Sequence, residues 1–273
     1  MSKVNNTVDL PYPDIYIKNN KVYQKVDREE IRVSDAMGIS TIKTDIDSSK
    51  IESMIYYYEC GIKKERSMDR NDYLNPTNLM SYQRFGLDVM RDNSYSLAKH
   101  FRNEEEIAKR VNIHKTLGFG IYNEKLIYKH HKCVGIDSTY EGEKEIKPKG
   151  SREIYLKMIK EDVIGHPPLE LIVSISLSSV LLGYIGEELS TQIVHLYGNS
   201  TTGKSTALKL AISLFGYPDV KKNGLFSTYN ATENALIKQL EGIKGVPFAF
   251  DEISMSKSNN FSDMIYKISN GVD

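Results

Sequence analysis

Apolar and polar residues alternate in short segments of the first 150 residues, a period of two that is typical of β-strands. Residues 14–26 alternate on both sides of Asn19-Asn20, and an asparagine pair at such a centre predicts a β-hairpin. Residues 51–59 (IESMIYYYE) are rich in β-forming side chains and predict a further strand. Residues 117–128 (LGFGIYNEKLIY) predict a strand, a turn and a second strand.

A helical spacing interrupts these strands. Residues 94–111 predict a helix that begins at Ser94 or Ser96, since a serine hydroxyl can accept from the first free N–H groups. We therefore expect residues 1–137 to be an α+β domain, without a catalytic motif that would define its role. The apolar side of its helix would consist of Leu97, Phe101, Ile107 and Val111.

The middle of the chain is a polar stretch followed by two helical patterns. Residues 138–151 contain Pro148 and Gly150 and predict a linker or loop. Residues 152–163 predict an amphipathic helix. Residues 169–186 form the most apolar stretch, but they include four serines, so we expect a buried core helix rather than the alternative, a membrane span. We assign 138–191 to a linker and helical segment.

From residue 192 the pattern changes to that of an α/β domain. Residues 192–197 predict a short buried strand, and residues 204–215 a helix that Gly216 and Pro218 bring to an end. The later elements alternate in the same way, as in a parallel sheet flanked by helices. They are a helix at 232–240 with Thr232 as cap, a buried strand at 246–250, and a helix at 261–269.

Composition narrows the classes of function. Lys+Arg and Asp+Glu both total 36, so no global positive field would hold nucleic acid as histones do, although a local basic groove is compatible with this balance. The two cysteines, Cys60 and Cys133, form no CxxC pair, which argues against a disulfide scaffold and favours the cytoplasm. The first residues lack the apolar core of a signal peptide.

Residues 198–205 (GNSTTGKS) match the phosphate-binding P-loop pattern G-x-x-x-x-G-K-[ST]. Gly198 and Gly203 would supply backbone angles that other residues resist, so that loop N–H groups point at a phosphate. Lys204 would place its ammonium between the β- and γ-phosphates, and Ser205 would offer its hydroxyl to Mg²⁺. We therefore predict a site for ATP with Mg²⁺. Its nucleotide-binding residues would be Gly198, Asn199, Ser200, Thr201, Thr202, Gly203, Lys204, Ser205 and Thr206.

Asp251 and Glu252 follow the apolar segment 246–250, where the Walker B acids of a P-loop protein lie. Asp251 would hold the hydration shell of Mg²⁺, and Glu252 would polarise the attacking water. With Lys204 these are the predicted catalytic and metal-binding groups. Two adjacent acids favour hydrolysis over simple nucleotide binding, although an Asp-Glu pair also ends many ordinary strands.

Each of the weaker candidate residues could have either a functional or a purely structural role. Asn270 could contact the γ-phosphate as a sensor or cap a helix before Gly271, and Asn230 could belong to a turn. His130, His131 and Cys133 could bind a metal ion, or they could belong to an ordinary strand. A second group could stack with single-stranded nucleic acid, or it could belong to a half-buried strand with a charged end. Its members are Tyr56, Tyr57, Tyr58, Lys63, Lys64 and Arg66.

From about Leu117 onward the chain resembles the P-loop ATPases of phages, plasmids and integrated elements catalogued as domain of unknown function 927. The most characteristic features are the Ser and Thr inside the P-loop, the Thr/Asn-rich segment before residue 232, and Asn270-Gly271. The first 110 or so residues match more loosely. The segments that carry the resemblance are residues 117–128, 151–183, 195–218, 227–242, 248–254 and 265–273.

The resemblance implies a helicase-like ATPase that acts with a primase domain in mobile-element replication, on DNA and as a ring of several copies. A RecA- or AAA+-like core would cover 192–273. Its last strands and any arginine finger would lie beyond Asp273, so we expect a fragment or a degenerate remnant, incomplete at its C-terminal side. The residues themselves leave two alternatives open: a nucleotide-dependent switch acting on a protein partner, and a small-molecule kinase.

Overall fold

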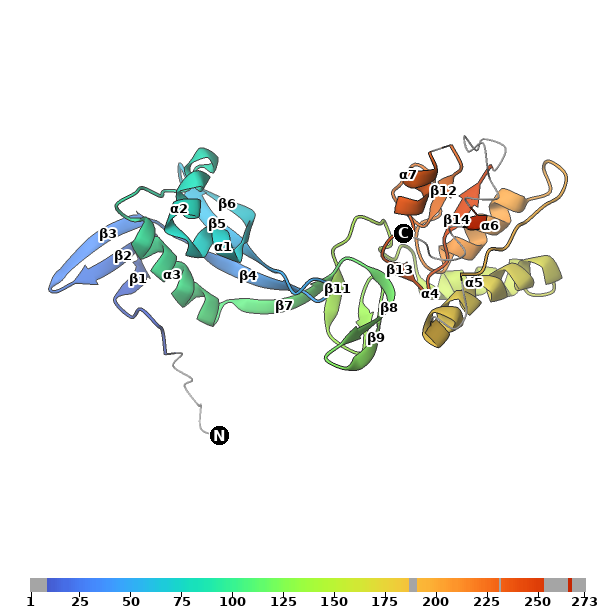
Figure 1. Ribbon diagram of the computed structural model, residues 1–273, viewed down its shortest axis with the longest axis horizontal. Helices are drawn as coiled ribbons and strands as arrows, with labels where there is room; N and C mark the ends of the chain where they lie inside the picture. Colours follow the sequence, from blue (N-terminus) through green and yellow to red (C-terminus); the bar gives the residue numbers. More distant parts are fainter. Residues whose placement is uncertain (1–8, 187–190, 231, 253–264, 267–273) are drawn as a thin grey trace. The chain divides into compact units, whose positions relative to one another are not determined.

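The computed structural model describes residues 9–186, 191–230, 232–252 and 265–266 of the chain (Figure 1). The chain divides into two compact units, residues 1–113 and 114–273. The division at 113/114 differs from the expected boundary at 137/138, because the strands from residue 117 onward belong to the second unit. Each unit is described by itself.

A three-stranded antiparallel sheet opens the first unit. Its strands are β1 (Ile15–Lys18), β2 (Lys21–Val26) and β3 (Glu29–Asp35), in the order β1-β2-β3. The predicted hairpin is confirmed, since Asn19 and Asn20 form its turn at φ values of 51° and 57°. Two successive residues with positive φ are the geometry of a type I′ turn, which asparagine tolerates better than most residues.

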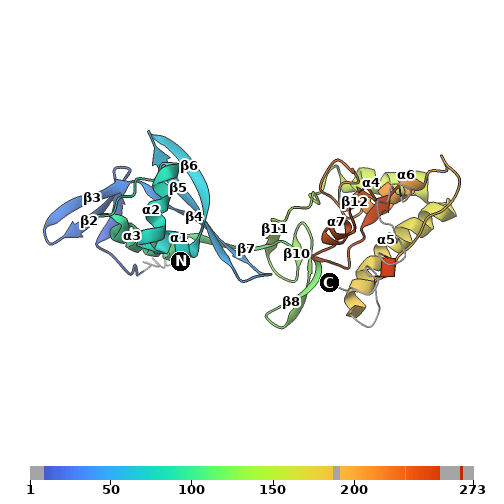
Figure 2. The ribbon, with the colours of Figure 1, turned by 45° about the horizontal axis from the view of Figure 1, so that its top comes forward.

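The second sheet of this unit contains β4 (Met37–Asp45), β5 (Ile51–Glu59), β6 (Ile62–Asp69) and β7 (Lys109–His114). Strands β4, β5 and β6 are antiparallel neighbours, and β7 runs parallel to β4 (Figure 2). The bounds predicted for β5 are confirmed. Strand β7 corrects the predicted helix 94–111, because α3 (Ser94–Ile107) ends earlier and Val111 pairs with Lys43 of β4. At residues 109–114, backbone hydrogen bonds to β4 stabilise a strand more than the helical spacing of apolar residues stabilises a helix.

Helices pack on this sheet and close a core. They are α1 (Arg70–Leu74), α2 (Pro76–Met80), the 3₁₀ turn η1 (Ser81–Phe85) and α3. Tyr73 of α1, Leu79 of α2 and Phe101 of α3 are fully buried. They belong to one apolar cluster with Ile42 and Ile55 of the sheet. All members of this cluster lie in the first unit, which therefore has a core of its own.

A small mixed sheet begins the second unit. The predicted strand-turn-strand is confirmed as β8 (Leu117–Tyr122) and β9 (Lys125–Lys129). Strand β10 (Cys133–Val134) pairs with β9, and β13 (Ile243–Lys244) pairs with β8 in parallel, so that segments far apart in sequence join one sheet. Strand β11 (Ser138–Tyr140) precedes an irregular stretch. This stretch is no free linker, because Ile146 is buried in the core of the unit.

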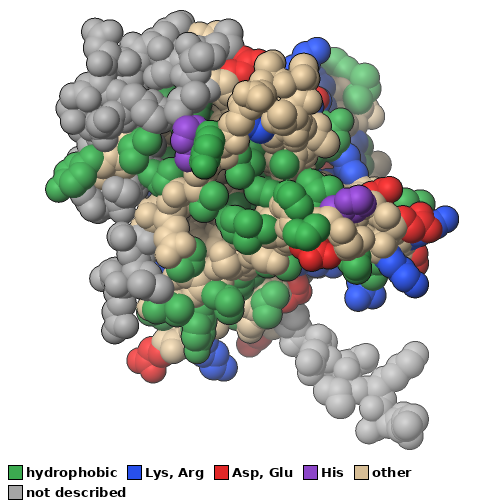
Figure 3. Space-filling view, turned by 90° about the vertical axis from the view of Figure 1, so that its right-hand side faces the viewer, with side chains coloured by type: hydrophobic (Ala, Val, Ile, Leu, Met, Phe, Trp, Pro, Cys, Tyr) green, Lys and Arg blue, Asp and Glu red, His purple; other side chains and the backbone are tan. Residues whose placement is uncertain are grey.

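Helices α4 (Arg152–Met158) and α5 (Pro167–Ile185) follow, with the π-helical turn η2 (Ile159–Val163) between them. Helix α5 was expected to be buried, and the structure corrects this. Only Ile172 and Ser176 of α5 are buried, whereas Leu181 is 65% exposed. Figure 3 shows hydrophobic side chains gathered on a face of this unit. Among the described residues, α5 alone is long and apolar enough to cross a membrane, a test that core helices outside membranes also pass.

The remaining elements are α6 (Lys204–Ser213), β12 (Phe226–Thr228), α7 (Glu233–Lys238) and β14 (Ala249–Asp251). Strands β12 and β14 pair in parallel, and α6 packs against β14. The helices expected at 204–215 and 232–240 are thus present in shorter form.

The strand expected at 192–197 is absent, which is a correction. These residues are irregular and mostly exposed, and Tyr197 is 88% exposed. An apolar run becomes a strand only where a neighbour accepts its backbone hydrogen bonds, and no described strand pairs with this one. The helix expected at 261–269 is described only at Ile265–Tyr266, which are helical, and Asn270 lies outside the described residues.

Candidate functional site

The backbone of the loop 198–203 adopts angles that its two glycines allow. Gly198 has a φ of 150° and Gly203 a φ of 83°, both in the region that favours glycine, and Thr201 adds a third positive value, 64°. Gly203 is the residue at which the loop passes into helix α6. The two glycines of the predicted P-loop therefore stand where the chain turns sharply.

Lys204 folds its side chain back over this loop. Its Nζ donates to the carbonyl oxygens of Gly198, at 3.0 Å, and of Asn199, at 2.5 Å. The Oγ1 of Thr202 also donates to the Asn199 carbonyl, at 2.9 Å. These hydrogen bonds to the loop carbonyls hold the positive charge of Lys204 at the loop.

Helix α6 begins without a side-chain cap, because its N-cap residue, Gly203, has no side chain that could accept from the first N–H groups. The N–H groups of a first helical turn have no partner within the helix, and the helix dipole adds partial positive charge there. Ser205 and Thr206 lie in this turn and are exposed. The loop, the ammonium and the helix start together form a site suited to an anion such as phosphate.

Asp251 is the last residue of β14, and Glu252 follows it outside the strand. The Oδ1 of Asp251 accepts from the backbone N–H of Glu252, at 2.9 Å. Glu252 is exposed and has a φ of 58°. The backbone therefore turns directly after Asp251, and the helix that carries Lys204 packs against the strand that ends at these acids.

Sequence reasoning missed the strand beside these acids. Thr228 ends β12 and lies opposite Asp251 in the parallel register, and the N–H of Tyr229 donates to the Asp251 carbonyl, at 3.1 Å. The carboxyl ends of parallel strands meet at one sheet edge, so Thr228 adds a hydroxyl next to Asp251. The sequence indicates this strand only through the two apolar residues Leu225 and Phe226, a run too short to identify a strand. Asn230 is exposed and irregular.

The donor set fits Mg²⁺, which prefers oxygen ligands and keeps several waters of its own. Ser205 and Asp251 would supply a hydroxyl and a carboxylate. The structure brings no three His, Cys, Asp or Glu side chains together as a metal site within its described part. This also applies to His130, His131 and Cys133. Burial lowers the pKa of His130, which favours its neutral ring.

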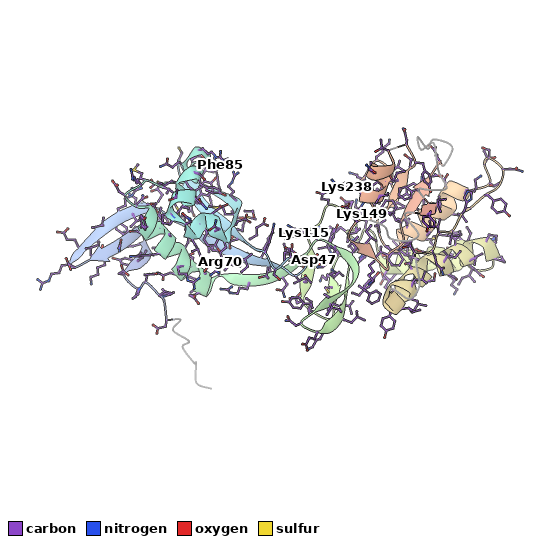
Figure 4. All side chains as sticks on the ribbon, viewed as in Figure 1. Asp47, Arg70, Phe85, Lys115, Lys149 and Lys238 are labelled. Carbon is purple, nitrogen blue, oxygen red and sulfur yellow. The ribbon has the colours of Figure 1, made fainter. Side chains whose placement is uncertain are left out.

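The tyrosine and lysine candidates lie on the β5–β6 hairpin. Tyr57 belongs to the core, and Lys63 and Lys64 form ion pairs with Glu65 and Glu59. Acidic partners thus neutralise much of the positive charge that a nucleic-acid surface would need. The guanidinium of Arg66 lies 3.4 Å from the ring centre of Phe85, which Figure 4 labels. This contact fixes the arginine within its own unit.

Comparison with known proteins relates this architecture to solved structures, among them one described as "SCCmec type IV Cch - active helicase". The TM-score is 0.70 at 21% sequence identity, and the match covers 94% of this chain and 50% of that one. The chain thus spans about half the length of the protein whose fold it shares. No curated protein matches the sequence. A family model described as "Domain of unknown function (DUF927)" matches residues 13–273. The chain therefore belongs to the DUF927 family.

Proposed function

We propose that the second unit binds ATP with Mg²⁺ and hydrolyses it, as the P-loop ATPase module of a helicase-like protein that acts on DNA in a phage or other mobile element. The observation that carries this proposal is the position of Lys204. Its ammonium lies over the carbonyls of Gly198 and Asn199, at the start of a helix without a side-chain cap. An ammonium and free N–H groups at one loop are what a chain of phosphates requires.

Each residue has a defined task in this function. The N–H groups of residues 199–206 would bind the β-phosphate oxygens, and Lys204 would neutralise charge between the β- and γ-phosphates. Ser205 and Asp251 would orient Mg²⁺, which supplies charge neutralisation for the phosphates when bound. Glu252, exposed beyond the strand end, would accept a proton from the attacking water.

The description "active helicase" of the structurally similar protein supports DNA as the partner. The mobile-element setting is supported by the sequence resemblance. A ring of several copies in the cytoplasm is the assembly that fits this function, since ATP-driven strand separation needs successive contacts along the DNA.

Lys204→Ala should lower the affinity for Mg²⁺-ATP by at least about tenfold, because it removes a charge-assisted contact with the phosphates. Lys209→Ala is the matched control, since Lys209 is exposed on the same helix and outside the loop. Glu252→Gln should keep nucleotide affinity and slow hydrolysis by about a hundredfold or more. Isothermal titration calorimetry and phosphate release measure the two effects.

The outcomes separate the parts of the proposal. Equal losses of affinity in Lys204→Ala and Lys209→Ala would contradict the nucleotide site, and wild-type hydrolysis by Glu252→Gln would remove Glu252 from catalysis. Hydrolysis should rise when single- or double-stranded DNA is added. A rate that neither form of DNA changes would contradict the helicase-like function and leave a protein-directed switch.

A further inference from the structure

A second site lies in the first unit, apart from residues 198–206. It is a pocket of about 510 Å³ lined by residues of β1, β4, β5 and α3 together with Leu10, Ala108 and Lys109. The side chains of Ile15, Ile17, Ile39 and Ile107 provide apolar walls. Branched aliphatic walls of this kind accept the flat face of a ring.

His100 lines this pocket, and one nitrogen of its buried ring has no hydrogen-bond partner. It is 2% exposed, and its Nε2 lies 2.7 Å from the carbonyl oxygen of Met37, so Nε2 carries the proton and donates. Its Nδ1 is therefore a lone-pair acceptor, and it has no hydrogen-bond partner. Burial lowers the pKa of His100 and keeps the ring neutral. A buried acceptor without a partner is rare in folded proteins and requires an explanation.

Glu104 presents a carboxyl group one helical turn away. Its Oε2 accepts from the N–H of Ile39, at 3.1 Å. Burial raises the pKa of Glu104, which favours the protonated form, and a protonated carboxyl can both donate and accept. Gly38 provides the space for this group, since a Cβ at Gly38 would overlap the Glu104 carboxyl and the Tyr56 hydroxyl.

Tyr56 contributes the third polar group. Its side chain lines the pocket, and no hydrogen bond involves its hydroxyl among the described residues. Burial, together with the nearby Glu104, raises the pKa of Tyr56, so the hydroxyl keeps its proton. The pocket thus places a carboxyl and a hydroxyl between apolar walls, with the buried ring of His100 beside them.

We propose that this pocket binds a nucleobase, either of a free nucleoside or of an unpaired strand. The edge of a base carries donors and acceptors side by side, which matches the Glu104 carboxyl and the Tyr56 hydroxyl, and its faces match the isoleucine walls. Lys109, an exposed residue of the lining, could contact a sugar-phosphate. An aliphatic chain would leave the Glu104 carboxyl and the Tyr56 hydroxyl without partners.

To test this, the full chain is titrated with adenosine, guanosine, cytidine and thymidine, and binding is measured by isothermal titration calorimetry. At least one nucleoside should bind, and Tyr56→Phe should weaken it by about fivefold, the effect of one lost hydrogen bond. Tyr58→Phe is the matched control, because Tyr58 is two residues along the same strand, half-buried, and outside the pocket. Binding should also move the ¹⁵N resonance of the His100 Nδ1.

Competition with a short single-stranded oligonucleotide identifies the source of the base. Competition supports a base of a strand, and its absence together with nucleoside binding supports a free nucleoside. A nucleoside has no phosphate for the loop at Lys204 to hold. The comparison of Tyr56→Phe with Tyr58→Phe therefore locates the binding in the first unit and keeps this test independent of the ATP proposal. The proposal is overturned if no nucleoside binds at millimolar concentration or if Tyr56→Phe and Tyr58→Phe behave alike.

Discussion

At the scale of single residues, two neighbouring glutamates of α3 have opposite surroundings. Glu104 lies at the pocket, where burial raises its pKa. Glu105 is 3% exposed and accepts from Arg70, at 2.7 and 2.9 Å, from Arg102 at 2.6 Å, and from the hydroxyl of Tyr73 at 2.8 Å. Burial alone would raise the pKa of Glu105, but the hydrogen bonds from Arg70 and Tyr73 outweigh it and lower the pKa. Figure 4 labels Arg70 in this unit.

Glu105→Gln should lower the free energy of unfolding at pH 7 by about 1–2 kcal/mol, because the arginines lose a charged partner. A carboxylate whose pKa is lowered by folding stabilises the protein above the unfolded pKa of about 4.3, and this contribution is lost as the pH falls through the folded pKa. The deficit of Glu105→Gln should therefore shrink in acid. Urea unfolding between pH 4 and pH 8 measures it.

Glu104→Gln is the counterpart with the opposite sign. A carboxyl whose pKa is raised by folding loses stability as the pH rises from the unfolded to the folded pKa. Gln imitates the protonated form, so Glu104→Gln should gain stability relative to wild type as the pH rises from 4. Glu106→Gln is the control, because Glu106 is exposed. If the stabilities of Glu104→Gln, Glu105→Gln and Glu106→Gln depended on pH in the same way, the different environments of Glu104 and Glu105 would be contradicted.

The P-loop residues and these glutamates differ in how far sequence could identify them. Lys204 and the glycines follow a motif in which spacing fixes the geometry of one local turn. Nothing in the run of Glu104, Glu105 and Glu106 distinguishes the three carboxyls. Their roles depend on partners in β4 and α1, which only the folded chain brings to them.

At the scale of elements, local turn chemistry was the more reliable guide. The Asn19-Asn20 hairpin was predictable because both residues adopt positive φ, which the sequence alone favours. The end of α3 and the segment 192–197 were predicted wrongly. In both cases pairing with a distant strand, or its absence, decided the conformation.

Asn20→Ala should lower the free energy of unfolding by about 1 kcal/mol, since alanine tolerates a φ of 57° less well than asparagine. Asn20→Gly should retain wild-type stability, because glycine adopts this φ freely. Asn71→Ala is the control, as Asn71 lies exposed in helix α1 with its backbone in the helical region. Thermal unfolding compares the three variants, and an equal loss in Asn20→Ala and Asn20→Gly would argue against the role of φ.

At the scale of the whole molecule, the chain consists of two units with separate cores. The apolar cluster of the first unit contains only residues before 114, and that of the second only residues after it. A unit with its own core can fold by itself. The division also separates the proposed nucleotide site from the proposed nucleobase pocket.

Residues 1–113 expressed alone should unfold cooperatively in urea, followed by circular dichroism. Residues 1–92 provide the control, since they lack α3, whose Leu97 and Phe101 are fully buried in the cluster. This shorter fragment should lose the cooperative transition. A gradual transition in the longer fragment would show that the first unit depends on the second.

The sequence by itself determined the hairpin at Asn19-Asn20, the strand β5, the helix after Gly203, and the loop that Lys204 covers. All of these depend on neighbours within a few residues, where spacing and backbone preference act directly. Only the tertiary structure decided that 109–114 is a strand, that 192–197 is not, that most of α5 is exposed, and that Glu104, His100 and Tyr56 line one pocket. These features depend on groups tens of residues apart, and hydrogen bonding and burial between them override the local pattern.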